Sequence, residues 1–253
     1  MSVACLHQPN FLPWTKLIDK VLASDIWIVY DSVQYTKTEF HSRQRIKARS
    51  GEAVWLTVPV LRAGRPRFQT LRDVELCFDH DWRAAHLRLL REHYQRSRYW
   101  SDVRDLIEAV YAREHTRLVE FNLALACAIL DYLGGTTEIV LASSLPHTGD
   151  NTERLIQLTR AVGADTHLTS TYGTDRQYID WDRVADAGIA VSDQHFVHPS
   201  YEQPHGLFLA NLSVIDLLCN CGRDSAAMLA ERRQTPVVLA ARSRSAASEL
   251  VTR

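Results

Sequence analysis

The sequence predicts a single α/β domain built on a mostly parallel, open β-sheet with helices on both faces. A short apolar strand, a helix and a second apolar strand follow one another within the first 31 residues, which is the order of a βαβ unit. Apolar strands and amphipathic helices continue to alternate along the chain, without an internal repeat. The 253 residues, of which 46% are hydrophobic and 23% charged, are enough for one substantial core.

The individual elements follow from apolar spacing and from the glycines that end helices. Expected strands lie at 3–7, 25–31, 54–60, 71–77, 138–142, 167–170 and 189–196. Expected helices lie at 14–22, 81–95, 101–112, 115–133, 151–162, 178–187 and 209–219. The block from 80 to 134 is expected to be a helical insertion or side layer. Residues 1–233 are predicted to form the catalytic domain, and 234–253 a mobile tail rich in Ala, Ser, Arg and Thr.

Composition excludes several classes of protein. A net charge of −1 gives no electrostatic footprint for nucleic acid. No run approaches the roughly 18 to 20 apolar residues of a membrane span, and the start lacks the basic region of a signal peptide. The five cysteines are odd in number and widely spread, which indicates reduced thiols in a cytoplasmic protein and favours neither disulfides nor a zinc site. No metal or cofactor is predicted.

The turn after the first expected strand carries the strongest polar signal. His7 and Gln8 come where a parallel strand ends, which is the edge at which open α/β sheets bind ligands. The following helix offers unpaired N–H groups and a positive dipole end to a phosphate or carboxylate. His7 can exchange a proton near neutral pH, and Gln8 and Asn10 can both donate and accept. Pro9 and Pro13 restrict the conformation of this turn. The alternative interpretation is that the turn is only tightly packed and that His7 is a hydrogen-bonded histidine of the core.

A basic segment after the second expected strand is the second candidate region. If residues 40–47 are extended, Arg43, Arg45 and Lys47 project from one face, where they suit a phosphate or a carboxylate. The alternative is a charged edge strand that discourages aggregation. Asp31, at the end of the second strand, is a candidate base or metal ligand, or else the ion-pair partner of Arg43 or Arg45.

The loop 169–178 is the third candidate region. Its hydroxyl groups, its glycine, Tyr172 and Tyr178 lie between a strand and a helix, where backbone N–H groups can cradle a phosphate. It matches neither a P-loop nor a dinucleotide fingerprint, and an ordinary Ser/Thr-rich helix cap is the alternative.

The fourth region is a polar loop that leads into the last expected helix. It contains Tyr201, Gln203 and His205. Near the end of the helix, Cys221 could form a nucleophilic set with His205 and Asp216. The pattern favours the alternative, in which Cys221 is a small buried thiol at a helix end.

Taken together, six ordered segments resemble the WbqC-like family between about residue 4 and residue 223. They are HQPNFLPW, FHSRQRI, WLTVPV, NTERLIQL, YEQPHGLF and LSVIDLLCNCG. The resemblance implies a cytoplasmic bacterial protein of cell-surface polysaccharide (O-antigen) or natural-product biosynthesis. It places these residues on the shared pattern: His7, Gln8, Pro9, Asn10, Pro13, Trp14, Arg43, Arg45, Pro59, Tyr201, Gln203, Gly206, Asp216, Asn220 and Gly222. The chain departs from that pattern at Thr15-Lys16, where a glycine is common, and in its glycine-poor loop before Tyr178. Both departures indicate a specialised substrate, and the family implies a setting more than a reaction.

The expected function is a biosynthetic transferase. It would move an acyl or aminoacyl group from a coenzyme A thioester, or from an acyl or peptidyl carrier protein, to the amine of an amino sugar or amino acid. His7 is the expected general base, and Gln8 and Asn10 are expected to orient the carbonyl or stabilise its oxyanion. The side chains expected to bind substrate are Trp14, Asp31, Arg43, Arg45, Tyr172, Tyr178, Tyr201, Gln203 and His205.

Two other functions remain open. The second hypothesis is a nucleotidyltransferase or an ATP-dependent ligase. The chain starts with a strand, a polar turn that contains a histidine and a helix, which is analogous to the HIGH-type nucleotidyltransferases, although the second histidine of their motif is absent. A non-catalytic module that binds a small molecule or a carrier protein is the third.

Overall fold

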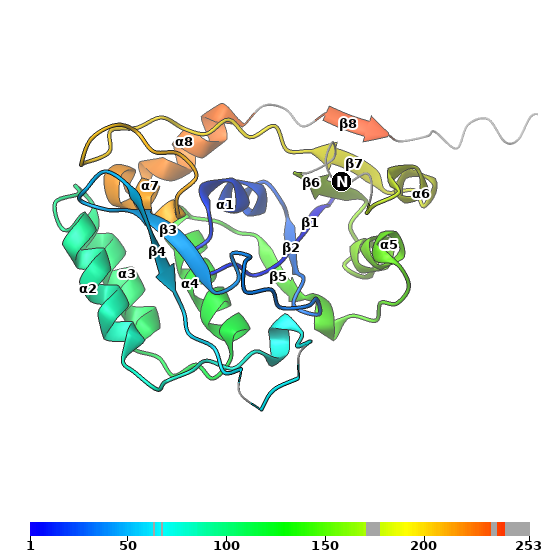
Figure 1. The fold of residues 1–253 in the computed structure, drawn as a ribbon. Helices are drawn as coiled ribbons and strands as arrows, with labels where there is room; N and C mark the ends of the chain where they lie inside the picture. Colours follow the sequence, from blue (N-terminus) through cyan, green and yellow to red (C-terminus); the bar gives the residue numbers. More distant parts are fainter. Residues whose placement is uncertain (63, 67, 171–177, 234–236, 241–253) are drawn as a thin grey trace, which may run out of the picture.

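A computed structural model describes residues 1–62, 64–66, 68–170, 178–233 and 237–240 (Figure 1). It confirms the α/β fold with a mostly parallel sheet. The sheet has the order β5-β2-β1-β6-β7-β8. Its strands are β1 (Val3–His7), β2 (Ile26–Val29), β5 (Glu138–Leu141), β6 (Thr166–Thr169), β7 (Ala190–Asp193) and β8 (Val237–Ala240). All neighbours pair in parallel except β7 and β8, which are antiparallel.

The strand order creates a crevice in the middle of the sheet. From β1 the chain builds outwards through β2 to β5, and then returns to place β6 against the other side of β1. The register pairs Ala4 with Ile26 of β2 and with His167 of β6. Because the winding direction reverses between β1 and β6, their carboxyl ends flank the topological switch point, where open α/β sheets bind ligands.

Helices cover both faces of this sheet (Figure 1). They are α1 (Thr15–Leu22), α2 (Trp82–Tyr94), α3 (Trp100–Tyr111), α4 (Leu118–Leu133), α5 (Asn151–Ala161), α6 (Trp181–Asp186), α7 (Val214–Cys221) and α8 (Asp224–Arg232). On one face, Cys5 and Trp27 pack in a core shared with α1, α4 and α7. On the other face, Ala4 and Ile28 pack with α5, since successive strand residues point to opposite sides. No helix among the described residues is long and apolar enough to cross a membrane.

The expected helical block becomes a side layer that carries a second, small sheet. Strands β3 (Arg43–Lys47) and β4 (Ala53–Thr57) form an antiparallel pair separate from the main sheet. Ile46 and Leu56 point inwards to the core, and His86 of α2 hydrogen-bonds to the Thr57 carbonyl at 3.1 Å. The segment expected at 54–60 is therefore a strand of this hairpin, which stands beside the main sheet.

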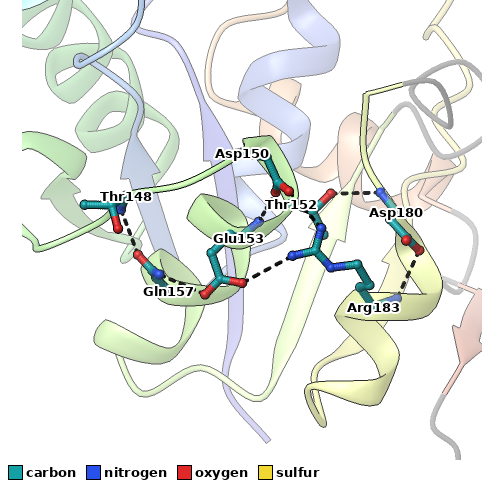
Figure 2. A network of polar contacts seen from close by, with 7 residues as sticks. All are labelled: Thr148, Asp150, Thr152, Glu153, Gln157, Asp180 and Arg183. Carbon is teal, nitrogen blue, oxygen red and sulfur yellow. Dashed lines mark hydrogen bonds and ion pairs between the residues drawn. The ribbon is translucent and has the colours of Figure 1, made fainter.

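The α5–α6 junction is tied by a polar network (Figure 2). Asp150 caps α5 by accepting from the Glu153 N–H at 2.8 Å, so the cap lies one residue before the expected Asn151 or Thr152. Arg183 of α6 pairs with Asp150 at 2.9 Å and with Glu153 at 3.4 Å. The Thr152 hydroxyl accepts from the Asp180 N–H at 2.9 Å. These contacts fix the start of α6 against the start of α5.

The structure differs from the expected elements at three places. The strand expected at 71–77 is instead a 3₁₀ turn at Leu71–Asp73 followed by isolated β-bridges. Leu71 and Val74 are buried, so the apolar residues that suggested a strand reach the core from this turn. The strand β8, which pairs antiparallel with β7, was not expected, and the boundary of the tail at residue 234 stays a prediction. The helix expected at 209–219 begins only at Val214 as α7, and a further helix that was not expected, α8, follows Gly222. Expectations for residues 241–253 lie outside the described residues.

Candidate functional site

The main cavity of the described structure lies at the carboxyl edge of the sheet. It has a volume of about 790 Å³ and is lined by the ends of β1 and β6, by the start of α1 and by the segment before β3. His7 ends β1 and Gln8 follows it, while His167 and Thr169 belong to β6 and Ser170 follows it. The cavity thus occupies the crevice that the strand order predicts for a ligand.

The turn after β1 is held rigidly by α4. Asn122 of α4 is fully buried, and its Nδ2 donates to the carbonyls of Pro9 at 2.9 Å and His41 at 2.8 Å. Phe11 and Leu12 are also fully buried, and the Phe11 N–H donates to the Phe40 carbonyl at 3.1 Å. These contacts fix the backbone on either side of the turn, so the neighbouring polar side chains are positioned before a ligand arrives.

His7 is a neutral hydrogen-bond acceptor at the cavity wall. Its Nδ1 lies 2.8 Å from the Gln8 carbonyl, which can only accept, so Nδ1 carries the proton. Burial, together with the charge of Lys20, lowers the pKa of His7 to about 3. At neutral pH its Nε2 therefore holds a lone pair, and that atom hydrogen-bonds to no described residue.

Gln8 presents hydrogen-bond donors to the cavity, where His7 presents an acceptor. The Thr36 N–H donates to Nδ1 of His41 at 3.3 Å, and burial lowers the His41 pKa to about 4. His41 is therefore neutral with its proton on Nε2, which donates to Oε1 of Gln8 at 2.8 Å. This bond fixes the Gln8 amide, whose N–H groups donate to no described residue. A free acceptor on His7 and free donors on Gln8 thus stand on adjacent residues of the cavity wall.

The cavity is electropositive. Lys16, Lys20 and Arg45 line it, against Glu39 as the carboxylate among the described lining residues. Lys20 is buried, with its Nζ 3.4 Å from the Leu6 carbonyl, and the Lys16 Nζ donates to Ser170 at 3.1 Å. The N-terminus of α1 lies here as well. The side chain of its N-cap residue, Trp14, makes no capping hydrogen bond. Such surroundings favour a phosphate or carboxylate.

Aromatic and apolar side chains form the remaining walls. Trp14 and Phe40 meet edge to face with ring centroids 4.6 Å apart. Leu155 of α5, Ile179 and Trp181, the first residue of α6, line the cavity as well, and the polar network drawn in Figure 2 joins these two helices. Flat apolar walls with a few fixed polar groups are typical of small-molecule sites.

Several predicted site residues lie outside this cavity. Asp31 is 1% exposed and accepts from the backbone N–H and hydroxyl of Ser143 at 2.9 and 2.6 Å, so it joins β2 to the end of β5. Asn10 is buried in the turn and does not line the cavity, and Tyr178 is 61% exposed. Tyr172 lies outside the described residues. Of the predicted residues, the cavity brings together His7, Gln8, Trp14 and Arg45.

The loop with Tyr201, Gln203 and His205 does not line the cavity, so the expectation of one combined site was wrong. Tyr201 and Gln203 both donate to Oδ1 of Asp216 at 2.8 Å, and Tyr94 donates to Oδ2 at 2.9 Å. Lys47 donates to Oε1 of Gln203 at 3.1 Å. We call these residues the Asp216 cluster. Asp216 is only 1% exposed, so its carboxylate oxygens need hydrogen-bond donors from the protein, and the neighbouring side chains supply them.

The same cluster bears on the cysteine hypothesis. Burial and the charges of Asp216 and Asp224 raise the pKa of Cys221 to about 11. Cys221 is therefore a protonated thiol at neutral pH, which disfavours a nucleophilic role, and its side chain is partly buried at the end of α7.

Sequence reasoning did not find several lining residues. They are Lys16, Lys20, Glu39, His167, Trp181 and Asn211. The spacing of Lys16 and Lys20 by four residues places them on one face of α1, which was a usable signal. His167 lies in an expected strand next to β1, but only the sheet order shows that β6 is that neighbour.

Comparisons with known proteins identify the family of the chain and leave its chemistry open. The profile of the WbqC-like protein family matches residues 8–228. The uncharacterized protein Rv1507c of Mycobacterium tuberculosis (strain ATCC 25618 / H37Rv) is 32% identical over 238 residues, which cover 92% of this chain and 100% of that protein. No solved structure matches significantly.

Proposed function

Because the chain belongs to the WbqC-like protein family, and because its cavity pairs a free acceptor with free donors, we propose that it is a biosynthetic transferase. It moves an acyl or aminoacyl group from a thioester to the amine of a small molecule that carries an anionic group. The five unpaired cysteines favour a cytoplasmic setting.

The observation that carries this proposal is the opposite polarity of the two neighbouring side chains. An attacking amine can donate an N–H to Nε2 of His7, which directs its lone pair away from the histidine. The thioester carbonyl can accept from the Gln8 amide, which is fixed by His41 and stabilises the oxyanion as it forms. The acceptor on His7 thus matches the amine, and the donor on Gln8 matches the thioester carbonyl, which are the two reactants of an aminolysis.

The low pKa of His7 changes the role that the sequence suggested for it. A group with a pKa of about 3 is a weak base, so His7 orients the amine and does not retain its proton. In the balanced reaction, the amine nitrogen forms a bond to the carbonyl carbon and the carbon–sulfur bond breaks. The proton leaves with the thiolate, whose ordinary pKa of about 8.5 makes it the stronger base.

Lys16 and Lys20, which line the cavity, bind the anionic group of the acceptor in this proposal. The carboxylate of an amino acid or the phosphates of a nucleotide-linked amino sugar both fit this requirement. The aromatic walls at Trp14, Phe40 and Trp181 cover the apolar faces of a ring.

The strand order supports a second candidate function. Taken in chain order, the five parallel strands have the arrangement 3-2-1-4-5 of nucleotide-binding α/β sheets, with the cavity at the switch point. A nucleotidyltransferase or an ATP-dependent amide ligase would use the lysines of the cavity to hold phosphates.

A transfer assay tests the proposal. Amino sugars, their nucleotide-linked forms and amino acids are mixed with acyl coenzyme A or an acylated carrier protein, and products are identified by mass spectrometry. We expect a new amide without ATP, and about a hundredfold loss of rate in Gln8→Glu, which retains the acceptor for His41 but lacks the donor. Amide formation that requires ATP and releases AMP or pyrophosphate would replace this proposal with the second. Ligand binding without any product would favour a binding module.

A further inference from the structure

A second ring-bearing surface lies outside the cavity on the β3–β4 hairpin. Trp55 projects from β4 and is 45% exposed. The guanidinium carbon of Arg43 lies 4.3 Å from its ring centroid, and that of Arg45 lies 5.8 Å away. We call Trp55, Arg43 and Arg45 the ledge.

Both guanidiniums of the ledge retain hydrogen-bonding capacity. Arg43 donates through Nη2 to the Thr38 carbonyl at 2.6 Å, and Arg45 through Nη2 to the Asn211 carbonyl at 3.2 Å. The Nε of each arginine is buried, whereas no described residue accepts from Nη1 of either arginine. Within the described part of the chain, neither arginine forms an ion pair with a carboxylate. The ledge therefore offers positive charge and unused donors beside an exposed indole.

The ledge is continuous with the cavity. Arg45 belongs to both, and Phe40, which lines the cavity, lies 6.0 Å from Trp55 between ring centroids. From Phe40 the row of rings continues to Trp14 at 4.6 Å and to His7 at 6.4 Å. Three ring-to-ring steps thus separate the ledge from the group that orients the amine.

This separation indicates what the ledge binds. An exposed indole stacks a nucleobase, and paired guanidiniums suit phosphate oxygens. The lysines at the floor of the cavity already serve the anion of the acceptor, so the ledge matches the other substrate. In coenzyme A, a pantetheine arm separates the adenine nucleotide from the thioester, as the row of rings separates the ledge from His7.

We propose that the ledge binds the adenine nucleotide of a coenzyme A thioester, with the base stacked on Trp55 and the phosphates held by Arg43 and Arg45. This inference rests on the proposed transferase function and names its donor. The pantetheine arm then runs past Phe40 and Trp14 and brings the thioester carbonyl to Gln8.

Isothermal titration tests the ledge without turnover. The probes are free coenzyme A, pantetheine, which lacks the nucleotide, and uridine diphosphate. We expect coenzyme A to bind at least tenfold more tightly than either of the other two. Trp55→Ala should weaken coenzyme A binding about tenfold or more, since base stacking of this kind contributes on the order of 1–3 kcal/mol. Arg43→Ala should weaken it and flatten its salt dependence, and Trp55→Phe should restore part of the affinity.

The chain offers a matched control at Phe78. This ring is 52% exposed, and the guanidinium carbon of Arg83 lies 4.9 Å from its centroid, but neither residue lines the cavity. Phe78→Ala should leave coenzyme A affinity unchanged, and melting curves show whether each variant is folded.

Two relative affinities measured by the titration would overturn the inference. One is unchanged coenzyme A affinity in folded Trp55→Ala, and the other is binding of pantetheine or uridine diphosphate as tight as that of coenzyme A. Failure of the transferase proposal is distinguishable, because coenzyme A would then bind the ledge while no amide forms. Transfer from a carrier protein alone, without coenzyme A affinity, would remove the ledge assignment and leave the transferase.

Discussion

The two polar clusters of this protein use similar groups in opposite ways. At the cavity, His7 and Gln8 each use one hydrogen-bonding atom internally and leave another without a described partner. In the Asp216 cluster, both carboxylate oxygens accept from neighbouring side chains, and Gln203 also bonds Lys47 and the backbone of Leu209. A buried polar group that lacks a partner is costly, so open capacity at a cavity indicates a ligand, whereas saturation indicates structure.

The largest expected effect is on the saturated cluster. Asp216→Ala leaves Tyr94, Tyr201 and Gln203 with buried donors, so we expect the free energy of unfolding to fall by about 3–5 kcal/mol. Urea unfolding followed by circular dichroism measures this. The matched control is Asp224→Ala, at an exposed carboxylate in the first turn of α8, where the change should stay within about 0.5 kcal/mol. A small loss in Asp216→Ala would mean that the cluster does not hold the loop.

The open cluster should show the reverse pattern. In Gln8→Glu, His41 retains an acceptor and the fold should remain stable, while the rate of transfer falls about a hundredfold for lack of a donor. Steady-state kinetics and melting curves, measured on the same preparation, separate the two effects. Equal losses of rate and of stability would place Gln8 with the structural residues.

The buried histidines predict a specific dependence of stability on pH. Burial, with a further contribution from Lys20, lowers the pKa of His167 to about 3, well below the unfolded value of about 6.5. The unfolded chain therefore binds more protons below pH 6.5, so stability is retained above that pH and is lost as the pH falls from 6.5 towards 3. For His167 alone the loss at pH 5 is about 2 kcal/mol.

Unfolding of wild type and of His167→Gln at pH 7.5 and pH 5 measures this contribution. Glutamine does not titrate, so the difference between the two pH values should shrink by about 2 kcal/mol in the variant. An identical pH dependence would show that His167 is not buried as a neutral group.

The smallest expected effect concerns Asp31. Ser143→Ala removes the hydroxyl that donates to Asp31 at 2.6 Å but leaves the backbone N–H, so we expect a loss of about 1.5 kcal/mol in stability. Ligand affinity should not change, since neither residue lines the cavity. A thermal melt with and without ligand checks both statements, and a loss of affinity would return Asp31 to the binding site.

The sequence predicted local structure better than long-range contacts. The βαβ start and most helices were found, because apolar spacing and terminal glycines act over a few residues. The strand β8 pairs with β7, which lies far back along the chain, and the place of the β3–β4 hairpin beside the main sheet depends on its packing against α2 and α7. Periodicity alone does not specify such partners.

The candidate site shows the same limit. His7 and Gln8 were predicted because they follow a strand at a sheet edge. The segment with Tyr201 and Gln203 is also rich in polar and aromatic groups. In the structure, however, both residues bond to Asp216, and Gln203 bonds to Lys47 as well. Whether a polar side chain is saturated depends on packing that composition does not reveal, and that property separates the two clusters.

The measurement that tests the account most directly is ligand-induced stabilisation of wild type and Gln8→Glu. The panel contains ATP with magnesium, CTP, a dTDP- or UDP-linked amino sugar, coenzyme A and an acylated carrier protein. Since a ligand that binds the folded state raises the melting temperature, we expect a rise with the amino-sugar nucleotide or the acyl donor that is reduced in Gln8→Glu and retained in Ser143→Ala. A rise with ATP and magnesium alone that is equal in wild type and Gln8→Glu would contradict the assignment of this cavity to acyl transfer.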